Sequence, residues 1–473
     1  MNSDKMLRVG GIVIGALVAI YLVYSRIHDF SNMPFLGGIL FLEVLAACLW
    51  RYDQLFFPLV MSTFIWAGTA IPMQGFGTAA RWFVLAAGAL VGYIIWMKNP
   101  RRHFTSFHLV AFFCICAAFV SASVSPFTQM ASFKALSLLL LFLYCSAGAR
   151  VAISGRIDRF FHGLLLACEG ITYLTAICYF IFDFKLWGNP NSLGAVTSIA
   201  LFPVLFWGWL TSSGTLRTRR MFALVLCTYL VFFSLARAGI SSMLLVTLMF
   251  CVALHQYKLL IKVAGVVLCL IAVTGVLTPS TLERTSGDLK DAALYKGHKD
   301  EGMFGSRRTP WESSVQTIKE RPLFGTGYGT SPNGEDPGEA FGKFASSAET
   351  AREHGSSYLT ITEWVGLLGV GPFLALLLLT VRNVWRVVGW MNRTSNPHHY
   401  SVPLAMIVLC GLVHATFEDW LFAVGSYACV FFWVSAFLLA DVVPAEAVAR
   451  IPGFAPRNVR PVANTLGAVA SGK

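Results

Sequence analysis

Charged residues are scarce in this chain of 473 residues. They make up 13% of the sequence, against roughly 25% in an ordinary soluble domain, whereas hydrophobic residues make up 56%. This balance excludes a disordered chain, a collagen-like chain and a typical soluble enzyme. Phe (38) and Trp (13) are abundant, as expected where aromatic rings lie at membrane interfaces. The composition therefore predicts a polytopic membrane protein.

Cysteines suited to disulfides or metal sites are also lacking. All 11 lie in apolar stretches, none lies in the polar segment 279–355, and no pair has zinc-finger spacing. We interpret them as small packing hydrophobes. No internal repeat or inverted symmetry of the kind many transporters show is present. The first apolar run lacks a small-residue cleavage site, so we expect a retained helix rather than a secretory signal.

Apolar runs bounded by charged or turn residues predict about fourteen membrane spans, each near the roughly 20 residues that a crossing helix needs. Several runs are short, so twelve crossings with re-entrant pieces are the alternative. The expected fold class is all-α: a polytopic bundle of 12–14 transmembrane helices with one large external loop containing short helices. The predicted spans are 7–25, 34–50, 54–71, 82–97, 107–124, 135–149, 161–182, 192–210, 221–236, 238–255, 259–278, 357–381, 401–417 and 421–441.

The distribution of Lys and Arg predicts the orientation. With the N-terminus inside, 21 of these residues fall on the cytoplasmic side and five in short external loops. Both termini are then cytoplasmic, and the net charge of +12 reports topology rather than nucleic-acid binding. The expected parts are transmembrane helices 1–11 (1–278), a large external loop (279–355), the C-terminal transmembrane helices (356–441) and a disordered tail (442–473).

A short helix is predicted within the external loop, which holds ten Lys/Arg and twelve Asp/Glu. Thr309 fits the N-cap of a capping box closed by Glu312, with Pro310 at the first helical position. Trp311, Val315 and Ile318 then recur with helical spacing, and Pro322 ends the helix.

Arg307 and Arg308 precede this predicted helix. Free backbone N–H groups and the partial positive charge of a helix N-terminus suit phosphate, and guanidinium adds a planar fork for phosphate oxygens. The alternative is that both side chains are simply solvated.

Arg237 lies between two apolar runs, with no other charged residue from Met221 to His255. A guanidinium inside or at the edge of a bilayer costs at least about 2.5 kcal/mol, so something must compensate that cost. One alternative is that the side chain reaches the external headgroups. The other is an anion site, which the small neighbours Ala236, Ala238 and Gly239 would let a ligand approach.

His354 lies where the external loop re-enters the membrane. Imidazole suits proton transfer near neutral pH, although a lone histidine can also be an ordinary polar surface residue. Glu349, Arg352 and Glu353 are close enough in sequence to orient it.

Glu418 and Asp419 lie near the external face between the last two predicted spans. Acids in such places are functional candidates by default. Pairing with Arg237 or with an arginine of the external loop is their expected role.

The segment Gly325-Thr326-Gly327-Tyr328-Gly329 resembles a nucleotide-binding loop, but it follows a helix and precedes no helical pattern. We interpret it as a tightly turned or flexible segment that shapes the entrance of a site.

Five short motifs, in order over roughly residues 185–425, resemble those of the O-antigen ligase/polymerase superfamily. These membrane glycosyltransferases act on undecaprenyl-diphosphate-linked glycans. In one departure, the family histidine aligns with Gly355, one residue after His354. The motifs are Gly188-Asn189-Pro190-Asn191-Ser192, Leu235-Ala236-Arg237-Ala238-Gly239, Ser306-Arg307-Arg308-Thr309-Pro310-Trp311, Pro322-Leu323-Phe324-Gly325-Thr326-Gly327, and His354-Gly355-Ser356-Ser357-Tyr358-Leu359 with Glu363-Trp364-Val365-Gly366 after it.

The resemblance implies roles for these residues. Arg237 and Arg307 would hold the pyrophosphate and neutralise the charge on the departing lipid diphosphate, and His354 would take the proton of the acceptor hydroxyl. No metal or other cofactor is expected, and attack opposite the leaving group would invert the anomeric centre. The expected substrate-binding residues are Arg308, Asn191, Tyr358 and Glu418.

The resemblance also implies partners and a location. The donor would be an undecaprenyl-diphosphate-linked glycan, the acceptor a glycan or lipid A–core, and the other partners membrane lipids and polysaccharide-assembly proteins. The expected location is the bacterial inner membrane with 279–355 in the periplasm. The departure at Gly355 favours a polymerase slightly over a ligase. A transporter or flippase for lipid-linked glycans is the alternative, and a membrane scaffold is a third class.

Overall fold

The structure, a computed structural model, describes residues 45–46, 52–71, 74–98, 104–261, 305–331 and 354–444. All regular elements in these ranges are helical, which confirms the all-α bundle. Six of its helical segments are long and apolar enough to cross a membrane, and three further apolar helices are shorter. The predicted spans at 7–25, 34–50 and 259–278 lie wholly or mostly outside the described ranges. The count of 12–14 crossings and the predicted orientation stay predictions.

In the first half of the chain, the helices follow the predicted spans closely. Two helices, which begin at Gln74 and Thr128, start well before their predicted spans 82–97 and 135–149, because polar residues near the helix start shorten the apolar run but not the helix. The elements are η2 (Asp53–Leu55), α3 (Phe56–Ala67), α4 (Gln74–Met97), α5 (Ser106–Ser123), α6 (Thr128–Leu143), the π-helical turn η3 (Tyr144–Gly148), α7 (Ala149–Ile153) and α8 (Ile157–Phe180).

In the second half, one span is interrupted by a π-helical turn and another is much longer than predicted. The last helix begins later than predicted, because the chain first makes turns after residue 414. The elements are α9 (Pro190–Ala195), η4 (Val196–Leu201), α10 (Phe202–Leu210), α11 (Gly214–Phe233), α12 (Arg237–Ala253), α17 (Ser357–Thr394), α18 (Ser401–His414) and α19 (Tyr427–Val442).

The helix predicted within residues 279–355 begins earlier than predicted. It is α15 (Gly305–Glu320), so the assignment of Thr309 as its N-cap is wrong and Pro310 lies inside the helix. The predicted apolar face is also wrong in part, since Val315 is 40% exposed while Ser314 and Thr317 are buried. The hydroxyl of Thr317 donates to the carbonyl of Ser313 within the helix, which lets this polar side chain be buried.

A glycine-rich turn joins the end of α15 to a break in α17. Gly366 has φ +68° and interrupts α17. The carbonyl of Glu363 accepts a hydrogen bond of 3.0 Å from the N–H of Thr326, and the N–H of Leu367 donates to Pro322 over 2.7 Å. Gly325 has φ +72°, which confirms a tight turn. The two backbones approach so closely that a Cβ at Gly325 would lie 2.4 Å from the carbonyl oxygen of Glu363.

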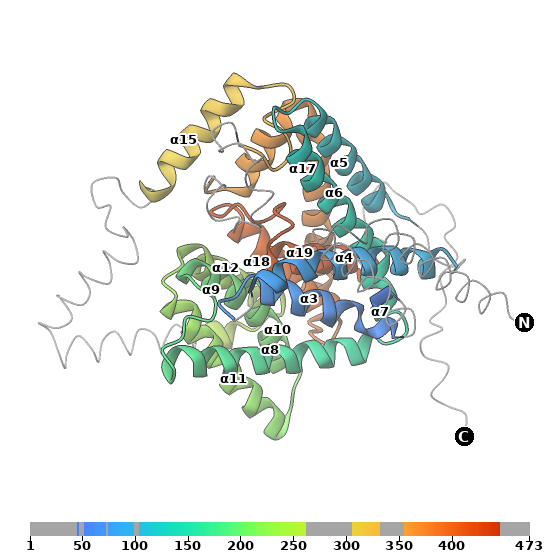
Figure 1. Cartoon of the computed structure of the whole chain (residues 1–473). Helices are drawn as coiled ribbons and strands as arrows, with labels where there is room; N and C mark the ends of the chain where they lie inside the picture. The colour runs from blue at the N-terminus through green and yellow to red at the C-terminus, as the bar shows by residue number, and fades with distance from the viewer. Residues whose placement is uncertain are drawn as a thin grey trace, which may run out of the picture.

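These contacts fix α15 relative to the bundle. Figure 1 shows α15 at the rim, above α9 and α12, with orange-red ribbon from the last part of the chain between them. α5 packs along α17, and its Ser121 hydroxyl reaches the carbonyl of Trp364 over 2.6 Å. The glycine-rich turn, the break in α17 and the end of α5 therefore form one connected support.

Replacement of Gly325 by Ala is expected to lower the midpoint of thermal unfolding. The new Cβ meets a backbone carbonyl, and a left-handed conformation costs a non-glycine residue about 1–3 kcal/mol. Gly371→Ala is the matched control, because Gly371 lies in α17 with nothing within 4 Å of an added Cβ. Equal midpoints for the two variants in a detergent thermal-shift assay would contradict this assignment.

Candidate functional site

Two adjacent carboxylates in the turn between α18 and α19 hold the site together. Glu418 accepts a hydrogen bond from Nη2 of Arg307, which lies in α15. Asp419 Oδ2 accepts a hydrogen bond of 3.1 Å from the backbone N–H of His354 and lies 3.3 Å from its Nδ1. Neighbouring residues of one turn therefore bring a guanidinium and an imidazole from distant segments side by side.

Gly355 explains why the histidine of this segment is residue 354. Its φ is +68°, and a Cβ there would lie 3.2 Å from Cδ of Arg307 and 3.3 Å from Nε1 of Trp311. Trp311 donates from Nε1 to the carbonyl of Gly355 over 3.0 Å. Because α15 packs directly on this glycine, a side chain at 355 would be strained and crowded. The imidazole therefore enters the site from His354, beside Arg307.

His354 is buried between two carboxylates. It is 4% exposed, and its Nε2 lies 3.3 Å from Oε1 of Glu363, which is 1% exposed in α17. Burial by itself lowers the pKa of His354, but the close pairing with Asp419 and Glu363 and the charges of these two acids raise the pKa from 6.5 to about 9. The imidazole is therefore an imidazolium at neutral pH in the protein without substrate.

Arg237 is the first residue of α12, directly after a tight turn in which Leu235 has φ +50°. It is half-buried, and its guanidinium is close enough to Arg307 for the two positive charges to repel each other. The positive end of the α12 dipole lies at the same place. Two guanidinium groups and a helix N-terminus thus converge next to the His354 turn.

The small residues around Arg237 serve helix packing rather than the expected ligand approach. A Cβ added to Gly194, at the end of α9, would lie 2.3 Å from Cβ of Ala236. One added to Gly239 would lie 3.0 Å from the carbonyl oxygen of Gly194. Close contact between α9 and the start of α12 therefore fixes the backbone that carries Arg237.

His414, the last residue of α18, completes the surroundings of Arg307. It is 1% exposed, and its Nδ1 accepts a hydrogen bond of 3.0 Å from Nε1 of Trp420. Its Nε2 has no hydrogen-bond partner in the part of the chain that the structure describes. Arg307 lies near enough to act electrostatically on this ring. A neutral ring that accepts at Nδ1 carries its proton on Nε2, which leaves a donor there.

The remaining predicted site residues are placed less favourably. Arg308 is exposed and pairs with Glu312 over 2.8 Å, one turn along α15. The hydroxyl of Tyr358 donates to the carbonyl of Leu412 over 2.7 Å, so this side chain joins α17 to α18. Asn191 is a half-buried residue of the first turn of α9, near the helix end capped by Asn189. The structure thus groups Arg307, His354 and Glu418, with Arg237 nearby.

The partner that sequence reasoning missed is Glu363. The residues expected to orient His354 (Glu349, Arg352 and Glu353) lie outside the described ranges. A usable signal was present, because Glu363 is the only acid between Glu353 and Glu418. An isolated acid in an apolar segment is a functional candidate by default.

Arg237, Arg307, His414 and the N-terminus of α12 together suit the binding of a polyanion. Guanidinium groups bind phosphate oxygens in pairs, and a helix N-terminus and a neutral imidazole N–H add further donors. The nearby imidazole–carboxylate pair can accept or release a proton. Together they could hold a diphosphate and act on a hydroxyl beside it.

Residues 222–357 match the sequence model of a family described as O-antigen ligase. The matched region begins in α11, contains Arg237, Arg307 and His354, and ends at the start of α17. A comparison with curated proteins gives no match.

Because His354 has a raised pKa in the folded protein, its contribution to stability is fully present below pH 6.5 and is lost as the pH rises through about 9. Burial raises the pKa of Asp419, but hydrogen bonds and the charge of His354 lower it below 3.8. The contribution of Asp419 to stability is therefore lost only as the pH falls below 3.8. We expect the thermal midpoint to fall between pH 7 and pH 10 by several degrees more in the wild type than in His354→Gln. Parallel pH curves would contradict the proposed ion cluster.

Proposed function

We propose that this chain, a member of the O-antigen ligase/polymerase superfamily by its residues 222–357, transfers glycan from an undecaprenyl-diphosphate-linked donor to an acceptor hydroxyl. The family makes it a multi-pass membrane protein of the glycosyltransferase type. The transfer would take place at the outer face of the bacterial inner membrane. The observation that carries it is the pairing of Arg307 and His354 with adjacent acids, beside Arg237.

The two arginines would bind the diphosphate. In the absence of substrate, the repulsion between Arg237 and Arg307 is offset in part by Glu418, which pairs with Arg307. A diphosphate placed between the two guanidinium groups would neutralise both. As the bond from the anomeric carbon to the diphosphate oxygen breaks, charge grows on that oxygen, and fixed positive groups stabilise it. Arginine could thus do in this site what a metal ion does in other glycosyltransferases.

His354 and Asp419 would act as one base. The side chain of Asp419 is 34% exposed whereas that of His354 is 5% exposed, so an acceptor hydroxyl meets Asp419 first. The hydroxyl proton would pass to this coupled pair while its oxygen attacks the anomeric carbon. Because the imidazole starts as an imidazolium, the pair must lose a proton before it can act. Attack opposite the diphosphate would invert the anomeric centre.

Because this sequence departs from the family's histidine motif at Gly355, we favour an exopolysaccharide or O-antigen polymerase slightly over a ligase.

The competing function is transport of a lipid-linked glycan without chemistry. Transporter sites lie near the bilayer midplane. Here Arg237, Arg307 and Glu418 lie at the start of α12, in α15 and just after α18, and only Glu363 lies within an apolar helix. This placement supports an enzyme.

Substitution of Arg237, Arg307 or His354 by Ala is expected to lower glycan transfer at least about a hundredfold, as loss of a charge-stabilising donor or a general base does. Purified protein is incubated with lipid-linked repeat units, with or without lipid A–core, and the products are resolved by size. Product that forms without lipid A–core identifies a polymerase, and product that requires it identifies a ligase.

Lys319→Ala is the control, because it removes an exposed positive charge from the same helix, α15. It should retain transfer near the wild-type rate. Wild-type transfer by Arg237→Ala and His354→Ala, with normal insertion, would rule out the proposed chemistry.

The pH dependence of transfer tests the base directly. In the wild type kcat/KM should rise with pH towards an apparent pKa of about 9, because the imidazolium must first lose its proton. Asp419→Asn removes a charge that raises this pKa, so its profile should move to lower pH while the maximal rate falls. An unchanged midpoint in Asp419→Asn would show that the pair is not the titrating base.

A further inference from the structure

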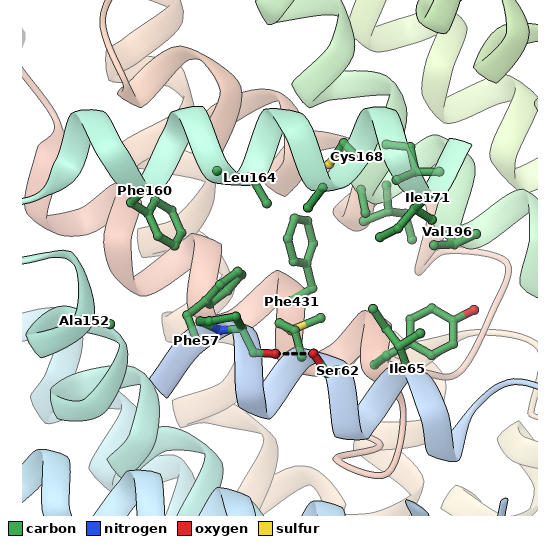
Figure 2. A pocket seen from close by; sticks show the side chains of 18 of the residues that line it. Phe57, Ser62, Ile65, Ala152, Phe160, Leu164, Cys168, Ile171, Val196 and Phe431 are labelled. Atoms are coloured by element: carbon green, nitrogen blue, oxygen red, sulfur yellow. Dashed lines mark hydrogen bonds between the residues drawn. The ribbon is translucent and has the colours of Figure 1, made fainter. Parts of the chain in front are cut away.

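A second site lies between α3, α8, η4 and α19. It is a cavity of about 620 Å³, and none of the residues of the Arg307–His354 site lines it. Figure 2 shows α8 on one side and α3 on the other, with Phe57, Phe160, Leu164, Ile171, Val196 and Phe431 lining the space between them. Ligand pockets in proteins usually measure about 300–1,000 Å³, so the cavity is large enough for a ligand.

One face of α8 forms the long wall of the cavity. Its lining residues recur every three or four positions from Arg159 to Ile171, a rise of about 18 Å. One leaflet of the hydrocarbon core is roughly 15 Å deep, so the wall exceeds the depth of one leaflet. Gly163 and Ala167 on this face are exposed, and a Cβ added to Gly163 would meet nothing within 4 Å. The cavity therefore opens along α8.

The middle of the cavity offers little to a polar ligand. The hydroxyl of Ser62 donates to the carbonyl of Pro58 over 2.5 Å within α3, as the dashed line in Figure 2 shows. The other labelled side chains are aliphatic or aromatic apart from the thiol of Cys168. An empty apolar space loses dispersion contacts on all its walls. Hydrocarbon is the occupant that restores these contacts in a membrane.

One end of the cavity is positively charged. Arg156 and Arg159 line it there, and Asp53 pairs with Arg156 over 2.6 Å. Arg159 is exposed and makes no hydrogen bond or ion pair within the described ranges. Both arginines flank the N-terminus of α8. The predicted spans 161–182, 192–210 and 221–236 lie between this point and Arg237, so the predicted topology puts the two ends on opposite sides of the membrane.

We propose that this cavity binds one acyl chain of an anionic phospholipid from the leaflet beside Arg156 and Arg159, with the lipid phosphate against these guanidinium groups. The positive charge of Arg156 and Arg159 at one end of the cavity suits a negative headgroup, and the apolar wall suits an acyl chain. The polyprenyl chain of a glycan donor fits less well. Its diphosphate would lie at the opposite face of the membrane, so the donor would offer no phosphate to Arg156 and Arg159.

The bound acyl chain would support α9, which packs against the residue just before Arg237. Ala195 and Val196 line the cavity directly after Gly194, whose backbone packs against Ala236. Tyr427 also lines the cavity, and its hydroxyl donates to the carbonyl of Ser192 over 3.3 Å. Filling the cavity thus supports the helix pair α9 and α12. Lipid that binds only the folded protein also raises its stability.

The test compares two glycines of α8. Gly163 lines the cavity and Gly170 does not, yet both are exposed and have open space where a side chain would extend. The purified full chain in detergent is titrated with phosphatidylglycerol, phosphatidylcholine or undecaprenyl phosphate, and binding is followed by native mass spectrometry and thermal unfolding. Gly163→Phe should weaken phosphatidylglycerol binding about tenfold or more. It should also abolish the rise in thermal midpoint that this lipid causes, whereas Gly170→Phe should behave like the wild type.

Arg159→Gln tests the headgroup. It should bring the affinity for phosphatidylglycerol down towards that for phosphatidylcholine, which carries no net charge. Equal binding by Gly163→Phe and Gly170→Phe would overturn the site. So would wild-type binding that does not distinguish the two phospholipids, or a Gly163-dependent preference for undecaprenyl phosphate over phosphatidylglycerol.

Discussion

The pairing of two neighbouring acids with two cationic groups is the interaction on which the rest of the site depends. Glu418 holds Arg307 and Asp419 holds His354, so one short turn joins α15 to the start of α17. Breaking one partner of a buried pair leaves an uncompensated charge, which costs more than the pair itself contributes. The turn between α18 and α19 is therefore the point at which α15 and the helices of the bundle become one site.

The positive charges of this site suit the binding of an anion. Arg237 and Arg307 repel each other, while Asp419 and Glu363 hold His354 in its charged form. Arrival of a diphosphate would relieve the repulsion, and deprotonation of the His354–Asp419 pair would prepare it for the hydroxyl. Substrate binding and activation of the base are then separate events with separate requirements.

Much of the fold follows from the sequence, because apolar runs of adequate length have little choice but to cross a membrane as helices. The site follows less fully. The motifs single out Arg237, Arg307 and His354, but no local pattern shows that Arg307 pairs with an acid 111 residues away. The capping box at Thr309 gives the wrong start for α15, because tertiary packing on the His354 turn outweighs a local signal. The buried partner Glu363 is hidden within an apolar helix.

We propose that Arg237 and Arg307 hold one diphosphate beside the His354–Asp419 pair. A cryo-EM structure in a lipid nanodisc with undecaprenyl diphosphate bound tests it most directly. We expect the diphosphate between the two guanidinium groups, within hydrogen-bond distance of both, and Asp419 facing the side from which an acceptor would approach. A diphosphate bound elsewhere, or contacted by neither arginine, would contradict the account.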